Sequence, residues 1–420
     1  IVLFLSISLE GEEFPHTRPL EMDGDLSVRM VSGISIFLDK KIQLSRKLRK
    51  DFWNRNNTSD EAYVKSIEKN RKHFQFCIGA NDELIPFKNL GLNSNTTTSS
   101  LRYKDEHMEV YSVYWPVFKG VTGEGLLINP LGPIRGRIIA LPDADQTPEQ
   151  IAGLCPGINP ESQFARHLAI AGCQVVIPTL INRDDEFSGA EGIAYTNQTH
   201  REWIYRQAFE MGRHIIGYEV QKIRAAINWF NLENSKTPNA IPIGIVGYNE
   251  GALIGFYAAA IDNRVKATMI SGYFCERDRI WNEPIYRNVF GLLEQFGDAE
   301  IASLICPRTL IVEHSSIKQI DAPPMVKRGR RGGAAPGILT TPATHLVESE
   351  FLRARDLGFK NNYIHLYSSQ DGINKKIPVD NFCNPTSIKK FLKKLNISTE
   401  EVNLRPKPLN HKIEVPTDRQ

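Results

Sequence analysis

Hydrophobic residues near the start of the chain recur at helical spacing. Within residues 25–55 they return every three or four positions, which places them on one side of a helix. The residues on this side are Met30, Ile34, Phe37 and Leu38. The pattern predicts an amphipathic helix that ends in an Arg- and Lys-rich turn.

A second helix is expected to begin at Ser59, because a serine followed by two acidic residues is a helix start signal. It should continue to about residue 78. The polar run at 93–100 then predicts an exposed loop or linker. We therefore assign residues 11–100 to a helical N-terminal extension.

From residue 109 the apolar runs become short, as in strands. Runs at 110–115 and 125–128 are separated by two glycines and predict an antiparallel hairpin. Strands and helices then alternate, which predicts a mostly parallel, twisted sheet with an antiparallel start and helices on both faces. The later strands are expected at 137–141, 173–178, 241–248, 266–272, 308–313 and 362–367, with helices at 201–231 and 384–396. Ligands of such sheets bind beyond the carboxyl ends of the strands.

The first half of the predicted helix at 201–231 is unusually polar. Residues 200–214 are dense in Arg, His and Glu, whereas the second half carries apolar residues at regular helical spacing. The polar half is interpreted either as a set of salt links that position the segment or as a cluster that faces a substrate.

The sharpest local signal lies where the apolar run 241–246 breaks. Gly247 and Gly251 bracket a turn, and small residues at helical spacing follow. Strand, tight turn and helix with glycines at these positions are what a nucleophile elbow needs. The tip, where such a turn carries serine, is Asn249. Asparagine tolerates the positive φ of the tip, so the backbone signal is kept while the hydroxyl nucleophile is missing.

Composition and charge narrow the class of protein only a little. The chain has 420 residues, 41% hydrophobic and 24% charged, which is ordinary for a globular protein. A net charge of +3 gives no reason to expect a nucleic-acid partner, and no segment is long and apolar enough to predict a membrane span. The one dense basic cluster, 327–331, is interpreted as a surface loop or an anion-binding loop.

The two ends of the chain carry their own signals. Residues 1–9 are apolar, so residues 1–10 are interpreted as a possible remnant of a signal peptide. A secreted or periplasmic protein is then expected; an N-terminal strand and a cytoplasmic location are the alternative. Residues 398–420 contain three prolines and predict an extended tail or linker. The six cysteines lack metal-ligand spacing and are expected to be mostly buried thiols.

Four local sequences together resemble the α/β-hydrolase superfamily, and within it the dienelactone hydrolase and acetyl xylan esterase branch. They lie at 141–146, 247–251, 281–287 and 296–302. The resemblance covers roughly residues 105–397 and implies an α/β-hydrolase domain at 101–397 that acts as a carboxylic ester hydrolase without a cofactor. Its partner would be a small-molecule or carbohydrate ester. The chain also resembles the first, degenerate half of longer bacterial hydrolase-like proteins, which implies a possible second hydrolase domain.

In that family an elbow serine attacks the ester, a histidine takes its proton and an acid orients the histidine. Here the elbow residue is Asn249, the acid position could be Glu313, and the loop after the last strand, 368–374, has no histidine. Histidines elsewhere would need an unusual arrangement to serve as the base. They are His314, His365 and His411.

The expected oxyanion hole consists of backbone groups. One donor would be the amide of Glu250, and the other would come from the loop that carries Asp143 and Asp145. Two carboxylates in that loop indicate hydroxyl binding, as with a sugar, or helix capping before Thr147. The complete set of expected substrate-binding residues is Asp143, Asp145, Tyr248, Arg183 and Tyr273.

Three functions are compatible with these residues. The first is ester hydrolysis at an altered centre, with Glu250 or Glu313 as general base or with Asn249 deamidated to a nucleophilic aspartate. The second is a degenerate domain that binds a glycan or supports a second, active hydrolase domain. The third is metal-assisted hydrolysis by acidic residues, for which a solvated acidic loop is the alternative, so no metal is expected. Its candidates are Asp143, Asp145, Asp184 and Asp185.

Overall fold

The computed structural model describes residues 15–18, 20–192, 195–360, 362–368, 381–400 and 404. The expected signal-peptide remnant, His411, most of the predicted tail and the loop 369–374 lie outside these residues. None of the helices formed by the described residues combines the length and apolarity that crossing a bilayer requires.

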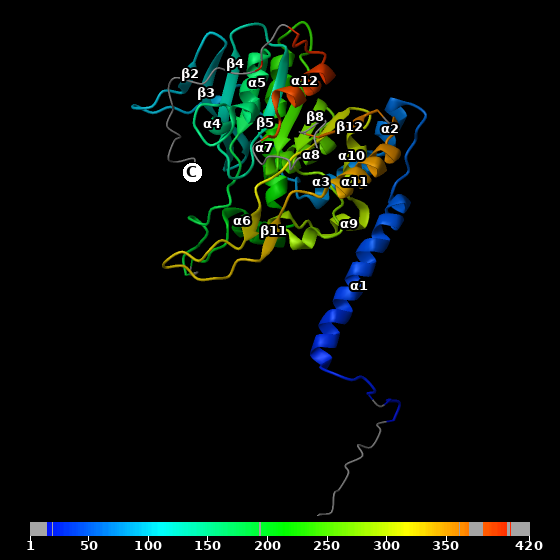
Figure 1. The fold of residues 1–420 in the computed structure, drawn as a ribbon. Coiled ribbons are helices and arrows are strands. Elements are labelled where there is room, and N and C mark those ends of the chain that lie inside the picture. The colour runs from blue at the N-terminus through cyan, green and yellow to red at the C-terminus, as the bar shows by residue number, and fades with distance from the viewer. Residues whose placement is uncertain are drawn as a thin grey trace, which may run out of the picture.

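A ten-stranded sheet forms the centre of the molecule (Figure 1). Its order is β1-β3-β4-β6-β5-β7-β8-β9-β12, with β2 paired to β3. The strands from β1 to β6 include the antiparallel pairs β3/β4 and β4/β6, and every pair from β6 to β12 is parallel. The predicted fold class is confirmed. The strands are β1 (Gly91–Leu92), β2 (Leu101–Lys104), β3 (Met108–Phe118), β4 (Val121–Pro130), β5 (Gly136–Leu141), β6 (Cys173–Pro178), β7 (Ile243–Tyr248), β8 (Val265–Ser271), β9 (Thr309–His314) and β12 (Ile364–Ser368).

Helices cover both faces of this sheet because successive strand residues point to opposite sides. In β5, Ile138 belongs to a core cluster with α5 and α12, whereas Ile139 belongs to a cluster with α3, α7, α8 and α10. The helices are α1 (Leu26–Leu48), α2 (Asp60–Ser66), α3 (Glu68–Cys77), α4 (Pro148–Ile151), α5 (Phe164–Ile170), α6 (His200–Glu210), α7 (Ile215–Asn234), α8 (Glu250–Ile261), α9 (Leu292–Gln295), α10 (Asp298–Ile305), α11 (Thr344–Leu357) and α12 (Pro385–Lys394).

The N-terminal helices differ in how they meet this core. Ser59 caps α2 as predicted, by accepting a hydrogen bond from the amide of Ala62. In α3, Phe74 packs on Tyr257 of α8 with ring centroids 5.0 Å apart. Helix α1 forms as predicted, but no residue in it is buried, and it extends away from the body of the molecule (Figure 1).

Two further segments depart from the sequence prediction. The helix expected at 201–231 is two helices, α6 and α7, because Gly212 adopts a positive φ of 60° and His214 then caps α7. A small two-stranded sheet, β10 (Ile320–Ala322) with β11 (Gly337–Leu339), was not predicted. Three-residue strands are too short to show an alternating pattern.

The turn between β7 and α8 has the backbone of a nucleophile elbow. Asn249 at the tip has φ 48° and ψ −108°, which confirms the predicted positive φ. A Cβ atom on Gly247 would lie 2.4 Å from the carbonyl oxygen of Gly251, and one on Gly251 would lie 2.3 Å from the carbonyl oxygen of Pro142. Both glycines are therefore required by close backbone approach.

Replacing Gly251 by alanine should destabilise the protein by about 1–3 kcal/mol or more, because the clashing atoms are backbone atoms of Leu141, at the end of β5, and of Pro142. Urea unfolding followed by circular dichroism measures this. Gly132→Ala is the matched control, since nothing lies within 4 Å of a Cβ at that position. Equal stability of the two variants would contradict the packing argument.

Candidate functional site

Asn249, at the elbow tip, is buried and hydrogen-bonded to a neighbouring arginine. The Asn249 side chain is 1% exposed, and its Oδ1 accepts a hydrogen bond from Nη2 of Arg287 at 3.0 Å. Its backbone amide donates to the carbonyl oxygen of Ser271 at 2.9 Å. An amide held in this way offers no nucleophile and no free acceptor to a ligand.

Glu250, the next residue, is buried among three arginines. Its Oε2 lies 2.8 Å from Nη2 of Arg287 and 3.3 Å from Nη2 of Arg183, and its Oε1 lies 2.8 Å from Nη2 of Arg201. Burial alone would raise the pKa of Glu250, but the three positive charges outweigh it and lower the pKa to about 2. A carboxylate with this pKa is a poor general base at neutral pH.

The expected oxyanion donor is already occupied. The backbone amide of Glu250 donates to Oδ1 of Asp143 at 3.1 Å. Arg183 holds the same carboxylate with two hydrogen bonds of 2.9 Å and also bonds Oδ2 of Asp145 at 3.0 Å. Burial would raise the pKa of Asp143, but Arg183 outweighs it, so the pKa is lowered and the carboxylate stays ionised. An incoming oxyanion would have to displace this carboxylate.

Glu313 faces a different set of groups. It is 1% exposed and accepts hydrogen bonds from the hydroxyls of Ser271 and Ser387 and from the amide of Cys383. Burial raises its pKa. No histidine is among these partners.

His314 and His365, the two candidate bases among the described residues, have other contacts. His314 Nε2 bonds the carbonyl oxygen of Pro342 at 2.9 Å. His365 stacks on Tyr367 within β12. Neither has a hydrogen bond or ion pair with Glu313, so the described residues do not assemble a serine-type triad.

The two tyrosines expected at the site have separate positions. The ring of Tyr248 stacks on Phe382 with centroids 3.6 Å apart, and its hydroxyl donates to the carbonyl oxygen of Ser316, so it is a core residue. Tyr273 instead lines a cavity of about 300 Å³ beside the elbow. Arg287 lines the same cavity and separates it from Asn249.

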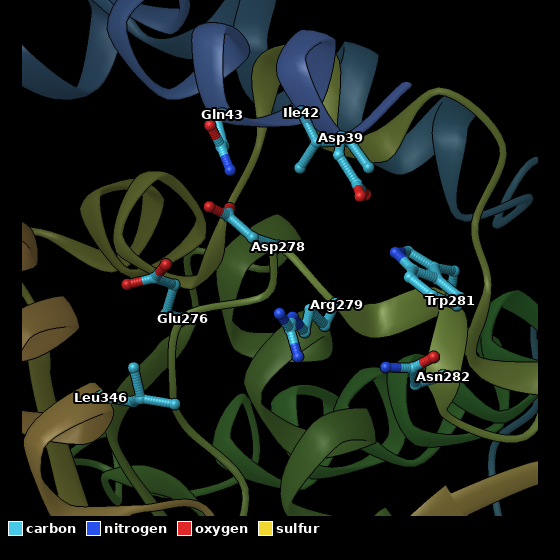
Figure 2. A pocket seen from close by; sticks show the side chains of 9 residues that line it. All are labelled: Asp39, Ile42, Gln43, Glu276, Asp278, Arg279, Trp281, Asn282 and Leu346. Atoms are coloured by element: carbon cyan, nitrogen blue, oxygen red, sulfur yellow. The ribbon is translucent and has the colours of Figure 1, made fainter. Parts of the chain in front are cut away.

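A second cavity, of about 570 Å³, adjoins the first and shares four lining residues with it. Asp39, Ile42 and Gln43 project into it from α1, opposite the loop that carries Trp281 (Figure 2). The Trp281 side chain is 53% exposed. The shared residues are Glu276, Arg279, Asn282 and Leu346.

The acidic residues proposed for a metal belong to separate ion pairs. Arg183 binds Asp143 and Asp145, whereas Lys327 lies 2.8 Å from Asp184 and 2.6 Å from Asp185. Among the described residues no group of histidine, cysteine and acidic side chains could hold a metal ion. Each of these carboxylates is therefore engaged by a cation of the same chain. The basic cluster at 327–331 is the partner of the acidic loop.

The polar segment 200–214 supplies salt links, as one of its two interpretations predicted. Arg201 is fully buried and bonds both Glu250 and the carbonyl oxygen of Ile181. Arg201 and Arg287 also belong to the site, and no sequence pattern predicts this. Their separations from Glu250 are 49 and 37 residues, too long for any local pattern to pair them.

Comparison of the sequence with protein-family profiles and with curated proteins gave no match. Among solved structures, a candidate acetyl xylan esterase of Bacteroides fragilis is 13% identical, with 83% of this chain and 86% of that chain covered and a TM-score of 0.51. A glucuronoyl esterase of Solibacter usitatus is 11% identical, with 80% and 94% covered and a TM-score of 0.51. At these identities the likeness establishes the fold alone. The chain has the α/β-hydrolase fold, with esterases as structural neighbours.

Replacing Glu250 by glutamine should cost about 3–5 kcal/mol of unfolding free energy, because three buried guanidinium groups lose their shared anion. Chemical denaturation at pH 7 measures this loss. Glu109→Gln, which breaks an ion pair with the exposed Lys104, is the control and should leave stability nearly unchanged. A Glu250→Gln protein as stable as the control would contradict the role given to the cluster.

Stability should also fall as the pH drops from 7 to 5. His214 is buried and caps α7 with Nδ1, and burial lowers its pKa from 6.5 to about 4. As the pH falls, His214 therefore binds a proton in the unfolded chain at a higher pH than in the folded protein. This difference lowers the unfolding free energy by about 2 kcal/mol between pH 7 and pH 5. His214→Asn keeps a capping side chain without this titration. Its unfolding free energy should depend less on pH than that of the wild type, and an unchanged dependence would contradict the assignment.

Proposed function

We propose that the protein is a carbohydrate-binding domain with the α/β-hydrolase fold and that it does not hydrolyse esters at its elbow. The observation that carries this proposal is the hydrogen bond from the Glu250 amide to Asp143. That amide would stabilise the oxyanion in an esterase. Here it is committed to a carboxylate of the same chain, beside a tip residue that has no hydroxyl.

Each of the other possible mechanisms of ester hydrolysis lacks a free general base or nucleophile. Glu250 keeps a pKa of about 2 among its arginines, and the Glu313 oxygens are engaged by buried hydroxyls and an amide. An aspartate formed by deamidation of Asn249 would lie against Arg287, which would pair with it and reduce its nucleophilicity. These contacts favour binding over turnover.

The two adjoining cavities have the chemistry that a sugar needs. Trp281 presents an exposed indole, and the apolar face of a pyranose or furanose ring can be buried against it. Gln43, Asn282 and Asp39 line the same cavity with planar hydrogen-bonding groups that suit hydroxyls. The names of the two structural neighbours, acetyl xylan esterase and glucuronoyl esterase, refer to carbohydrate esters, which supports the same ligand class.

We extend the proposal to domain organisation and location. Residues 101–397 would form the hydrolase-fold domain, and residues 11–100 an N-terminal extension whose helix α1 lines one side of the larger cavity. The apolar run at residues 1–9 favours a secreted or periplasmic protein. A second hydrolase domain in a longer protein would supply turnover that this one lacks.

Wild type, Asn249→Ser and Asn249→Ala should all be inert toward short-chain aryl esters and acetylated sugars. The serine variant gains a hydroxyl but no base and no free oxyanion donor. Release of the phenol or of acetate measures turnover. Hydrolysis by the wild type that Asn249→Ala abolishes would refute the proposal.

Calorimetric measurement of the binding of acetylated xylo-oligosaccharides tests the proposed ligand class. Trp281→Ala should weaken the affinity about tenfold or more, because an aromatic side chain that becomes buried against the ligand dominates such contacts. Phe290→Ala is the control: this residue is 82% exposed and lines neither cavity. Absence of binding by the wild type, or equal losses in both variants, would contradict the proposed site.

A further inference from the structure

Helix α1 carries an apolar surface that the described chain does not cover. Its exposed side chains include Met30 at 70%, Ile34 at 59% and Phe37 at 57%. Only its C-terminal part meets the rest of the protein, chiefly at α9 (Figure 1). Soluble monomers rarely leave a contiguous apolar patch of this kind in water, and such a surface marks an interaction site.

The central stripe of this surface is symmetric along the helix. It consists of Leu26, Met30, Phe37, Leu44 and Leu48, which lie within roughly 40° of one another at 100° per residue. The spacings are 4, 7, 7 and 4, so they read the same from either end, with Phe37 at the midpoint. A second copy laid antiparallel about Phe37 therefore places Leu26 opposite Leu48 and Met30 opposite Leu44.

Charge favours the same orientation. Residues 20–25, just before and at the start of α1, carry three acidic residues and no basic one. Residues 46–51 carry four basic residues and one acidic one. Arg46 and Arg49 pair with Glu276 and Glu300 of the body, whereas Lys47 and Lys50 have no ion pair among the described residues and can face a partner. In an antiparallel pair the acidic start of each helix faces the basic end of the other, whereas a parallel pair would bring like charges together.

The apolar stripe of α1 continues into a groove between this helix and the body of the protein. A cavity of about 360 Å³ lies between α1 and α9, lined by Leu44 and Leu48 of the stripe and by Phe52 and Leu293. In the register centred on Phe37, the N-terminal half of a partner helix runs along this groove. The same patch then serves both copies, as a two-fold interface requires.

We propose that the protein forms a homodimer through an antiparallel pairing of two α1 helices about Phe37. The partner is a second copy of this chain. This inference is independent of the proposed function, because it rests on the stripe of α1 and the groove beside it, and not on the elbow or on Trp281.

Sedimentation velocity over a range of concentrations tests the dimer with the full chain. The wild type should sediment as a dimer. Phe37→Glu, which places two like charges at the two-fold axis, should weaken the dimer about tenfold or more without unfolding an exposed site. Phe290→Glu, at an exposed aromatic outside α1, should leave it unchanged.

A charge swap tests the orientation. Lys47→Glu with Lys50→Glu should weaken the dimer, and adding Glu21→Lys with Asp23→Lys should restore it, because opposite charges again face each other. A wild-type monomer at all concentrations overturns the proposal, whether or not it binds vesicles of phosphatidylcholine and phosphatidylserine. So does a dimer that Phe37→Glu leaves intact. Failure of the swap to restore a weakened dimer overturns the antiparallel orientation.

Discussion

At the carboxyl edge of the sheet, one buried carboxylate holds three separate segments in place. Glu250 begins α8, while its partners Arg183, Arg201 and Arg287 come from the loop after β6, from α6 and from the turn before α9. Each guanidinium would be costly to bury alone, so the position of each segment depends on the same anion. Four further carboxylates each pair with one of these arginines. Asp143 and Asp145 pair with Arg183, Glu219 with Arg201 and Glu283 with Arg287.

This cluster occupies the place where an esterase of this fold would hold its reacting ester. The strained tip at Asn249 and its close glycines remain, because they are consequences of how β7, α8 and the loop after β5 pack. At the tip, Asn249 and Glu250 are paired with arginines of the same chain. The elbow backbone is therefore kept although its tip residue is an asparagine, and the open space lies beside the elbow, beyond Arg287.

The sequence predicts the parts of this arrangement that depend on neighbours along the chain. Alternating and continuous apolar runs identify the strands, and two glycines around Asn249 identify the elbow. Pairing across 37 to 107 residues leaves no such signal, so Arg287, Arg201 and the contact from the Glu250 amide to Asp143 required the structure. The partner of the acidic loop after β6 was unpredictable for the same reason, since Lys327 is 143 residues away from Asp184. The amphipathic pattern of α1 was clear, but a pattern shows that a face is apolar and not what covers it.

The two proposals meet at α1. Its Asp39, Ile42 and Gln43 border the larger cavity, while Phe37, Leu44 and Leu48 belong to the stripe that would pair with a second copy. In a free monomer a helix with no buried residue is held only at its C-terminal end, and the cavity wall that it forms is held no better. Pairing would fix α1 and with it the groups opposite Trp281. Because linkage is reciprocal, a ligand that bridges Gln43 and Trp281 would in turn favour the dimer.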